Sequence, residues 1–205
     1  MLDNSNGEAG DIEINCDAAS DPFAGTIPEP TSINCDYTGA VYGAGEVTLS
    51  PGVYCGWYNF NDRDTVVTFE PGVYILRNGG WNIDGGQWIG KGVSFYFYDN
   101  TRLQFNRGVR ARMSAPTTGD YAGIYMTERK GLSAGQLVIN DNEGFNFEGI
   151  LYLPSKDFIM NGGATVEART MSIVARTISF NGAHVSIAVD ENATSGTVIG
   201  PYLSE

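Results

Sequence analysis

An internal repeat constrains the fold of this chain more than any other feature of its sequence. In six segments, two large apolar residues are separated by one residue and followed by Asn or Asp. The apolar pairs are Tyr58 with Phe60, Trp81 with Ile83, Leu103 with Phe105, Leu137 with Ile139, Phe158 with Met160, and Ile178 with Phe180. Two-residue spacing is typical of a β-strand, so we predict six strands whose apolar pairs face one interior.

The Asn or Asp after each pair recurs at intervals of 20 to 23 residues, except for one interval of 34. These short side chains tolerate the left-handed backbone of a tight turn, and an amide can bond the equivalent residue one repeat away. We therefore predict a ladder along one corner of the fold. Its members are Asn61, Asp84, Asn106, Asn140, Asn161 and Asn181.

Two more series of short strands keep the same phase. Strands of one series start at a glycine before a β-branched residue, as at Gly52 and Gly72. Strands of the other series lie between an apolar-pair strand and the next glycine-led strand, as in Thr65–Phe69. Three short strands per repeat cannot each bury a face alone, and winding them into a solenoid solves this. The sequence predicts an all-β fold, a right-handed parallel β-helix of about six three-strand coils with an irregular N-terminal cap.

The competing fold is an antiparallel β-sandwich or jelly roll, which also has short strands and frequent turns. Such folds show no fixed period with the same residue type at each corner, so the repeat favours the β-helix. With 27 glycines and only 18% charged residues, the composition argues against a helical bundle or a coiled coil.

The repeat divides the chain into three parts. Residues 1–48 form an acidic leader and cap, because ten acidic residues and no Lys or Arg precede Arg63. The segment from Asp11 to Tyr42 has no repeat phase, and we expect it to cap the first coil or to pack along one side. Residues 49–190 form the β-helix, with an insertion within 107–135, around 114–119 and 128–135. Residues 191–205 form a C-terminal cap or tail.

The charge and the cysteines exclude several functions. A formal charge of −12 would repel a phosphate backbone, so we expect no nucleic-acid partner. Three cysteines without a CxxC pair and a single His argue against a zinc site, and one disulfide with a leftover thiol is the simplest alternative. No P-loop or HExxH motif is present, and we expect no cofactor or metal.

A polysaccharide lyase or hydrolase is the alternative function for this fold. Such enzymes use clustered carboxylates, with Ca²⁺ and Arg in the lyases. The acidic candidates are Asp62 and Asp64 around Arg63, then Asp84, and Asp141 with Glu143. Most of them lie at predicted turns, where acidic residues are ordinarily solvated, so we expect a protein that is not an enzyme.

A carbohydrate-binding surface module is a third interpretation of the sequence, in which exposed aromatic residues form a platform for sugar, pilin or another surface. Trp81 and Trp88 fall in inward phases, whereas Trp57 is out of phase and is predicted to lie on the surface. A basic patch on an acidic protein favours a directed encounter with an acidic partner, and half of the basic residues lie between positions 102 and 130. The candidate partner surface comprises Trp57, Arg107, Arg110, Arg112, Tyr121, Arg129 and Lys130.

Several motifs, taken in order along the chain, resemble a known family. They are Asp21-Pro22-Phe23-Ala24-Gly25, Cys35, Leu49-Ser50-Pro51-Gly52-Val53-Tyr54-Cys55-Gly56, Glu70-Pro71-Gly72-Val73-Tyr74, the stretch Ser114 to Ile124, and Gly149 to Pro154. Over residues 20–190 they resemble the C-terminal extracytoplasmic region of TadG-like pilus-assembly proteins, from the Tad/Flp systems of alphaproteobacteria. Trp57 departs from the family pattern, in which a small residue follows the Cys-Gly pair.

The resemblance implies an extracytoplasmic protein of the bacterial envelope, held to a membrane only through an N-terminal helix that is not in this chain. It also implies a disulfide between Cys35 and Cys55, because both lie in the resembling stretch and the envelope is oxidising. The implied function is that of a non-catalytic structural or adhesive ectodomain. Its partners would be pilin, other pilus-assembly proteins or a surface polysaccharide.

Overall fold

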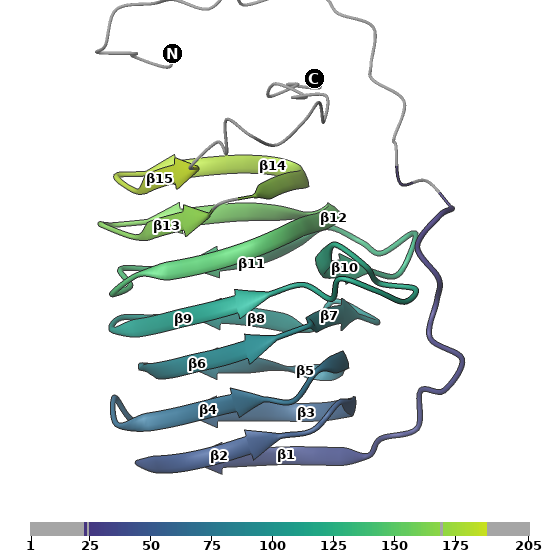
Figure 1. Ribbon diagram of the computed structural model, residues 1–205, viewed down its shortest axis with the longest axis horizontal. Helices are drawn as coiled ribbons and strands as arrows, with labels where there is room; N and C mark the ends of the chain where they lie inside the picture. Colours follow the sequence, from purple (N-terminus) through teal and green to yellow (C-terminus); the bar gives the residue numbers. More distant parts are fainter. Residues whose placement is uncertain (1–22, 24, 169, 188–205) are drawn as a thin grey trace, which may run out of the picture.

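Parallel β-strands make up the regular structure of the computed structural model, which describes residues 23, 25–168 and 170–187 (Figure 1). Within these ranges there are fifteen strands and no helix. Their bounds are β1 Tyr37–Tyr42, β2 Gly45–Leu49, β3 Gly52–Phe60, β4 Thr65–Phe69, β5 Gly72–Ile83, β6 Gly86–Lys91, β7 Val93–Phe97, β8 Arg102–Phe105, β9 Val109–Ser114, β10 Ile124–Glu128, β11 Gly135–Ile139, β12 Phe145–Asn161, β13 Thr165–Ala168, β14 Met171–Asn181 and β15 His184–Ile187.

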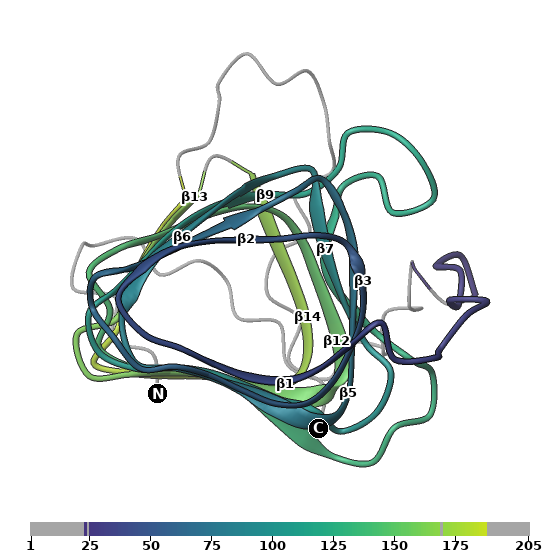
Figure 2. The same cartoon turned by 90° about the horizontal axis from the view of Figure 1, so that it is seen from below.

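The strands stack into a β-solenoid of about seven turns. Seen from below, the chain runs clockwise as it moves away from the viewer, which is a right-handed path (Figure 2). The predicted right-handed parallel β-helix is therefore confirmed. The coil beyond the predicted six comes first, where β1 pairs with β3 and β2 pairs with β4.

Because of this first coil, the predicted boundary at residue 49 lies too late, and part of the predicted leader belongs to the β-helix. Ala40 and Tyr42 have the apolar spacing of the repeat, but Gly43 stands where later coils have Asn or Asp. The coil lacks the residue that marks the others, so the repeat does not reveal it. Residues 1–22 and 191–205, which include the predicted C-terminal cap or tail, lie outside the described residues.

Each coil has three faces. The ladder face holds β1, β8, β11 and the second halves of β3, β5, β12 and β14. The plain face holds β2, β4, β6, β9, β13, β15 and the start of β12. The third face is called the strap face, because the segment 25–36 covers it. It holds β7, β10 and the remaining parts of the long strands. Long strands turn from the strap face onto the ladder face where the pairing register shifts, as between Cys55 and Trp57.

The interior contains the predicted apolar pairs. Ten of their twelve residues are at most 2% exposed, which confirms the inward phase. Ile178 and Phe180 are the exceptions, at 44% and 47% exposed, because no strand among the described residues covers the last coil. Trp81 and Trp88 are each 1% exposed with ring centroids 5.9 Å apart, so both belong to the core as predicted.

The segment 25–36, here called the strap, runs along one side of the solenoid past the ends of several coils (Figure 1). Of the two predicted roles for the leader, capping or lateral packing, the described part takes the second. The ring of Phe23 packs edge-on against Tyr152 in β12, 5.4 Å between centroids. Lower down, the Tyr121 hydroxyl donates to the Pro28 carbonyl at 2.8 Å. The strap therefore spans the strap face from β12 down to β3.

The strap explains why β7 and β10 are buried at every position. Inner side chains such as Phe95 and Met126 enter the main core. On the outer side, Tyr96 of β7 belongs to a second apolar cluster near the strap, formed with Val53, Cys55 and Ile75, against which Val73, Tyr98 and Tyr121 pack. Both strands are therefore buried along their whole length, in contrast to the alternating buried and exposed pattern of β6 and β9 on the plain face.

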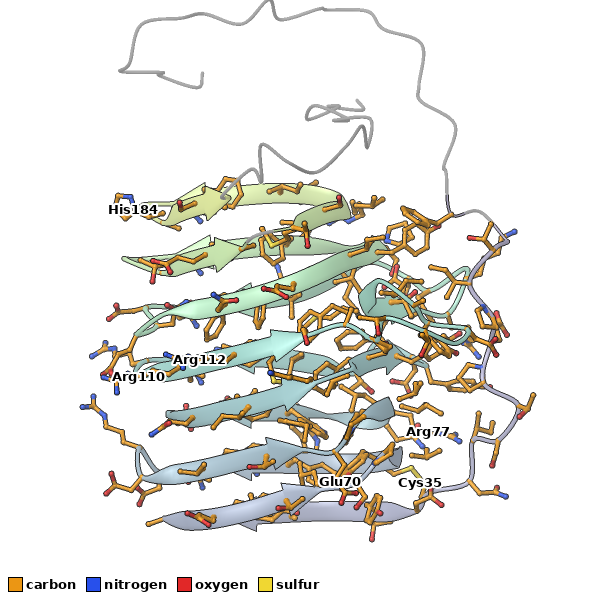
Figure 3. All side chains as sticks on the ribbon, viewed as in Figure 1. Cys35, Glu70, Arg77, Arg110, Arg112 and His184 are labelled. Atoms are coloured by element: carbon orange, nitrogen blue, oxygen red, sulfur yellow. A yellow bond between two sulfur atoms is a disulfide. The ribbon has the colours of Figure 1, made fainter. Side chains whose placement is uncertain are left out.

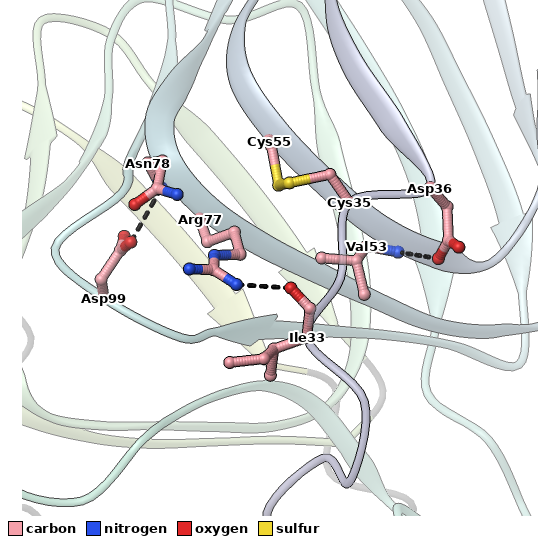
Figure 4. Close-up of a disulfide and its surroundings, with 8 residues drawn as sticks. All are labelled: Ile33, Cys35, Asp36, Val53, Cys55, Arg77, Asn78 and Asp99. Carbon is pink, nitrogen blue, oxygen red and sulfur yellow. Dashed lines mark hydrogen bonds between the residues drawn. A yellow bond between two sulfur atoms is a disulfide. The ribbon is translucent and has the colours of Figure 1, made fainter.

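A disulfide between Cys35 and Cys55 fixes the lower end of the strap to β3 (Figure 4). This confirms the pairing implied by the resemblance, and Cys16 lies outside the described residues. Beside the bond, the Val53 N–H donates to Asp36 Oδ2 at 2.8 Å, and the Arg77 guanidinium donates to the Ile33 carbonyl. The strap is thus held by one covalent bond and several polar contacts.

We expect the double change Cys35→Ser with Cys55→Ser to lower the free energy of unfolding by about 3 kcal/mol, because it opens a loop of 20 residues. Urea denaturation of oxidised protein, reduced protein and the double variant measures this. The reduced protein should match the variant. Equal stability of all three would contradict a stabilising crosslink.

Candidate functional site

The predicted corner ladder is a chain of side-chain hydrogen bonds. Asn106 Nδ2 donates to Asp84 Oδ1 at 2.6 Å, and each later amide donates to the residue one coil below. These bonds are Asn140 to Asn106 at 3.1 Å, Asn161 to Asn140 at 3.0 Å and Asn181 to Asn161 at 2.8 Å. Asn61 occupies the same corner one coil below Asp84, but among the described residues the side-chain ladder begins at Asp84.

A groove of about 630 Å³ lies along this ladder. Its lining consists of Asp84, Asn106, Arg107, Asn140, Asp141, Asn161 and Gly162. A smaller groove of about 160 Å³ is lined by Arg63, Asp64, Gly86, Gln87, Gly108, Arg110 and Glu143. The structure therefore brings together Asp84 with Asp141, and Asp64 with Glu143, but it divides the predicted carboxylates between two places.

Most of these carboxylates are engaged in turns, in the ladder or in an ion pair. Asp62 Oδ1 accepts the N–H of Asp64 at 2.9 Å, which stabilises the turn before β4. Both oxygens of Asp84 accept amide hydrogens of the ladder region. Glu143 pairs with Arg110 at the surface. No three His, Cys, Asp or Glu side chains within the described ranges are placed to hold a metal ion.

The predicted partner surface does not form one patch. Arg107 and Arg110 line the two grooves, and Arg112 is exposed on β9, in the half of the molecule away from Arg77 in Figure 3. Arg129, by contrast, lies beside the strap face, with its guanidinium carbon 4.6 Å from the centre of the Tyr98 ring.

Two insertion loops account for this division. They follow β9 and β10, at 115–123 and 129–134, where the insertion was predicted. Tyr121 is half-buried because its hydroxyl bonds the strap, whereas Lys130 is exposed on the second loop. The insertion therefore contributes in part to holding the strap.

Trp57 lies on the ladder face and is 55% exposed, as predicted for a surface residue. Its ring covers Gly80 of the next coil, where a Cβ atom would lie 2.6 Å from Trp57 Cζ3. The neighbouring Gly79 is required for another reason, because a Cβ there would lie 2.1 Å from the Gly56 carbonyl oxygen. Two glycines thus leave room for a tight corner and a flat indole.

A buried ion pair was missed by the sequence reasoning. The side chains of Glu128 and Lys156 are each 1% exposed, and Lys156 Nζ lies 4.0 Å from Glu128 Oε2. The ammonium also lies 4.7 Å from the centre of the Phe97 ring. Burial lowers the pKa of Lys156, while the charges of Glu128 and Asp99 oppose that shift. The two-residue spacing of the strand could have revealed this burial, because Lys156 lies two residues before the inward Phe158 and four before the inward Met160.

The ladder makes a direct prediction for stability. Asn140→Ala removes one donor and one acceptor from the middle of the ladder, and we expect a loss of about 1–3 kcal/mol in urea denaturation. Asn61→Ala is the matched control at the lower end, where the loss should be smaller. Equal losses for the two variants would show that the ladder bonds do not stabilise the corner.

The fold and these surfaces define the chain as a right-handed parallel β-helix domain with a disulfide-anchored lateral strap. No protein-family model, curated protein or solved structure matches it. In the part of the chain that the structure describes, no helix has the length and hydropathy needed to cross a membrane.

Proposed function

We propose that this domain is a non-catalytic structural or adhesive ectodomain of a bacterial cell-surface protein of the Tad/Flp pilus-assembly type. The observation that carries the proposal is that motifs behind the family resemblance have structural roles in the solenoid. Its partners would be pilin, other assembly proteins or a surface polysaccharide.

The Pro-Gly-Val-Tyr motifs illustrate these roles. A Cβ at Gly72 would lie 2.6 Å from the ring of Pro51, so the glycine of one coil packs on the proline of the coil below. The Tyr74 hydroxyl lies within hydrogen-bond distance of two carbonyls, 2.7 Å from Leu49 and 2.8 Å from Glu70. The second motif therefore builds a corner and ties it to the preceding coil, while the Tyr54 hydroxyl of the first motif donates to the Ser50 carbonyl at its own corner.

The disulfide supports an extracytoplasmic location, because such bonds persist in oxidising compartments. The acidic composition also agrees with a surface that repels nucleic acid. Both observations are consistent with an envelope protein that presents a rigid body outside the cytoplasm.

Deletion of the gene in the parent bacterium tests the proposal. We expect loss of surface attachment or of pilus assembly, restored by the wild-type gene, and labelling of the domain by antibody on intact cells. Normal attachment and normal pili in the deletion strain would overturn the proposal.

The lyase or hydrolase alternative has one observation in its favour, the groove that joins Asp84, Asp141 and Arg107. We expect no unsaturated or reducing products when the protein is incubated with polygalacturonate or alginate, with and without Ca²⁺. Product formation that is abolished by Asp84→Asn or Asp141→Asn would replace the structural function with the enzymatic one.

A further inference from the structure

The surroundings of Trp57 form an ordered strip on the outer surface of the ladder face. Strand pairing aligns Trp57 in β3 with Gly80 in β5 and Arg102 in β8. Two residues further along the same strands, and on the same side of the sheet, are Asn59, Asn82 and Gln104. Strands lie about 4.8 Å apart and residues rise about 3.3 Å each, so the strip measures about 10 by 7 Å.

Two of the three amides of the strip, those of Asn82 and Gln104, are oriented by the corner ladder. Asn82 Nδ2 donates to Asp84 Oδ2 at 2.9 Å, and Gln104 Nε2 donates to Asn106 Oδ1 at 2.8 Å. Gln104 Oε1 and the whole Asn59 amide have no protein partner among the described residues. A free acceptor on an oriented amide, Gln104 Oε1, and the unbonded amide of Asn59 thus lie on the same strip as an exposed indole.

We propose that this strip, Trp57 with Asn59, Asn82, Gln104 and Arg102, is a binding site for a neutral polysaccharide. A pyranose has an apolar face of C–H groups that fits a flat indole, and hydroxyls around its rim that bond amides and a guanidinium. Gly80 contributes by having no side chain, which lets the ring of Trp57 lie on the sheet. The proposal rests on the adhesive function proposed above and names its ligand.

Other ligands fit the strip less well. A peptide that adds to a sheet needs a free strand edge, but β3 is paired on both sides, with β1 and β5. An anionic polymer would meet a protein of net charge −12, and Arg102 is the single cation of the strip. Neutral sugar rings need neither a free edge nor a cationic surface.

Binding of the purified chain to insoluble cellulose, chitin and curdlan tests the proposal, together with acrylamide quenching of tryptophan fluorescence in soluble dextran and xyloglucan. Trp81 and Trp88 are buried, so quenching reports mainly on Trp57. We expect at least one neutral glycan to retain the protein and to protect Trp57 from quenching. Trp57→Ala should weaken retention at least tenfold, and Trp57→Phe about threefold.

Two further variants separate binding from folding. Asn59→Ala removes an unbonded amide from the strip and should weaken binding about threefold. Ile89→Ala removes an exposed apolar side chain from β6 on the plain face, 41% exposed, and should leave binding unchanged. Near-ultraviolet circular dichroism checks that each variant keeps its core.

The outcomes distinguish this inference from the proposed function. If none of the neutral glycans retains the wild-type chain, or if Trp57→Ala binds as well as wild type, the glycan site is refuted. Preferential binding to alginate or polygalacturonate would also refute it, in favour of an anionic ligand. In each of these cases, an attachment defect in the deletion strain would leave the adhesive function standing. Normal attachment and normal pili in that strain would refute the function even if glycan is retained.

Discussion

Raising the pH from 10 to 12 should unfold this protein cooperatively, because several buried tyrosines resist ionisation in the folded chain. Burial is the main cause of the raised pKa of Tyr54, Tyr58, Tyr74, Tyr96 and Tyr125. For Tyr58 it raises the pKa to about 12, with a smaller contribution from Tyr42 and Tyr37. In the unfolded chain each of these phenols would ionise near its ordinary value of 10.

The sign follows from proton binding. Above pH 10 the unfolded chain releases phenolic protons that the folded chain retains, so stability is fully present below pH 10 and is lost as the pH rises. Tyr58 alone should cost the folded state about 2 kcal/mol at pH 12, and the other four add to this. Circular dichroism during an alkaline titration, repeated in urea at several pH values, measures the loss.

Tyr58→Phe isolates one contribution. The Tyr58 hydroxyl has no hydrogen-bond partner among the described residues, so its removal should leave stability at pH 7 unchanged or slightly higher. The same change should raise the pH of unfolding. Tyr37→Phe is the control, because the Tyr37 side chain is 40% exposed in the folded chain. An alkaline transition that responds equally to both changes would contradict burial as its cause.

Glu128→Leu should lower the free energy of unfolding by about 3–5 kcal/mol at pH 7, because it leaves the buried ammonium of Lys156 without its opposing charge. The N–H of Ser155 would also lose its acceptor, Glu128 Oε1. The double variant Glu128→Leu with Lys156→Met should recover most of the loss, since it removes both charges and keeps apolar volume. Urea denaturation of the three proteins measures the coupling.

An exposed pair provides the control for this result. The side chains of Arg110 and Glu143 are 63% and 44% exposed, and Glu143→Gln should cost less than about 1 kcal/mol. If Glu128→Leu costs no more than Glu143→Gln, the buried pair does not stabilise the fold. Lys156 adds a pH dependence, because its pKa is lowered on folding. Its contribution should therefore make stability rise with pH up to about 10, before the tyrosines reverse the trend.

Much of the solenoid was predictable because each coil uses the same pattern of buried apolar residues and corner residues. Inward pairs such as Tyr58 with Phe60 recur with a marker residue at the same corner, and this fixed both the fold and the ladder. The first coil was not predicted, because Gly43 stands where the later coils have the marker Asn or Asp. The strap has no repeat, so whether it capped or flanked the solenoid depended on long-range contacts such as that of Tyr121 with Pro28.

The candidate site was less predictable, because residues that are close in the sequence can lie on different faces of the same coil. The segment 107–135 covers most of one turn of the solenoid. Arg107 and Arg129 therefore lie at different corners of the coil, although they are close in sequence. Trp57 could be assigned to the surface from its phase. The amides beside it could not, because their alignment with Trp57 arises from the register of β3, β5 and β8.

The disulfide between Cys35 and Cys55 also determines how tension would travel through the molecule. Trp57 follows Cys55 by two residues in β3, within the second coil. A pull on the chain ahead of Phe23, resisted by a surface held at Trp57, would first strip the strap from Tyr152 and Tyr121. It would then pass through the sulfur–sulfur bond directly to β3. Once the strap has separated from Tyr152, Tyr121 and Arg77, coils three to seven would carry no further load, so the disulfide could bear tension without unwinding those coils.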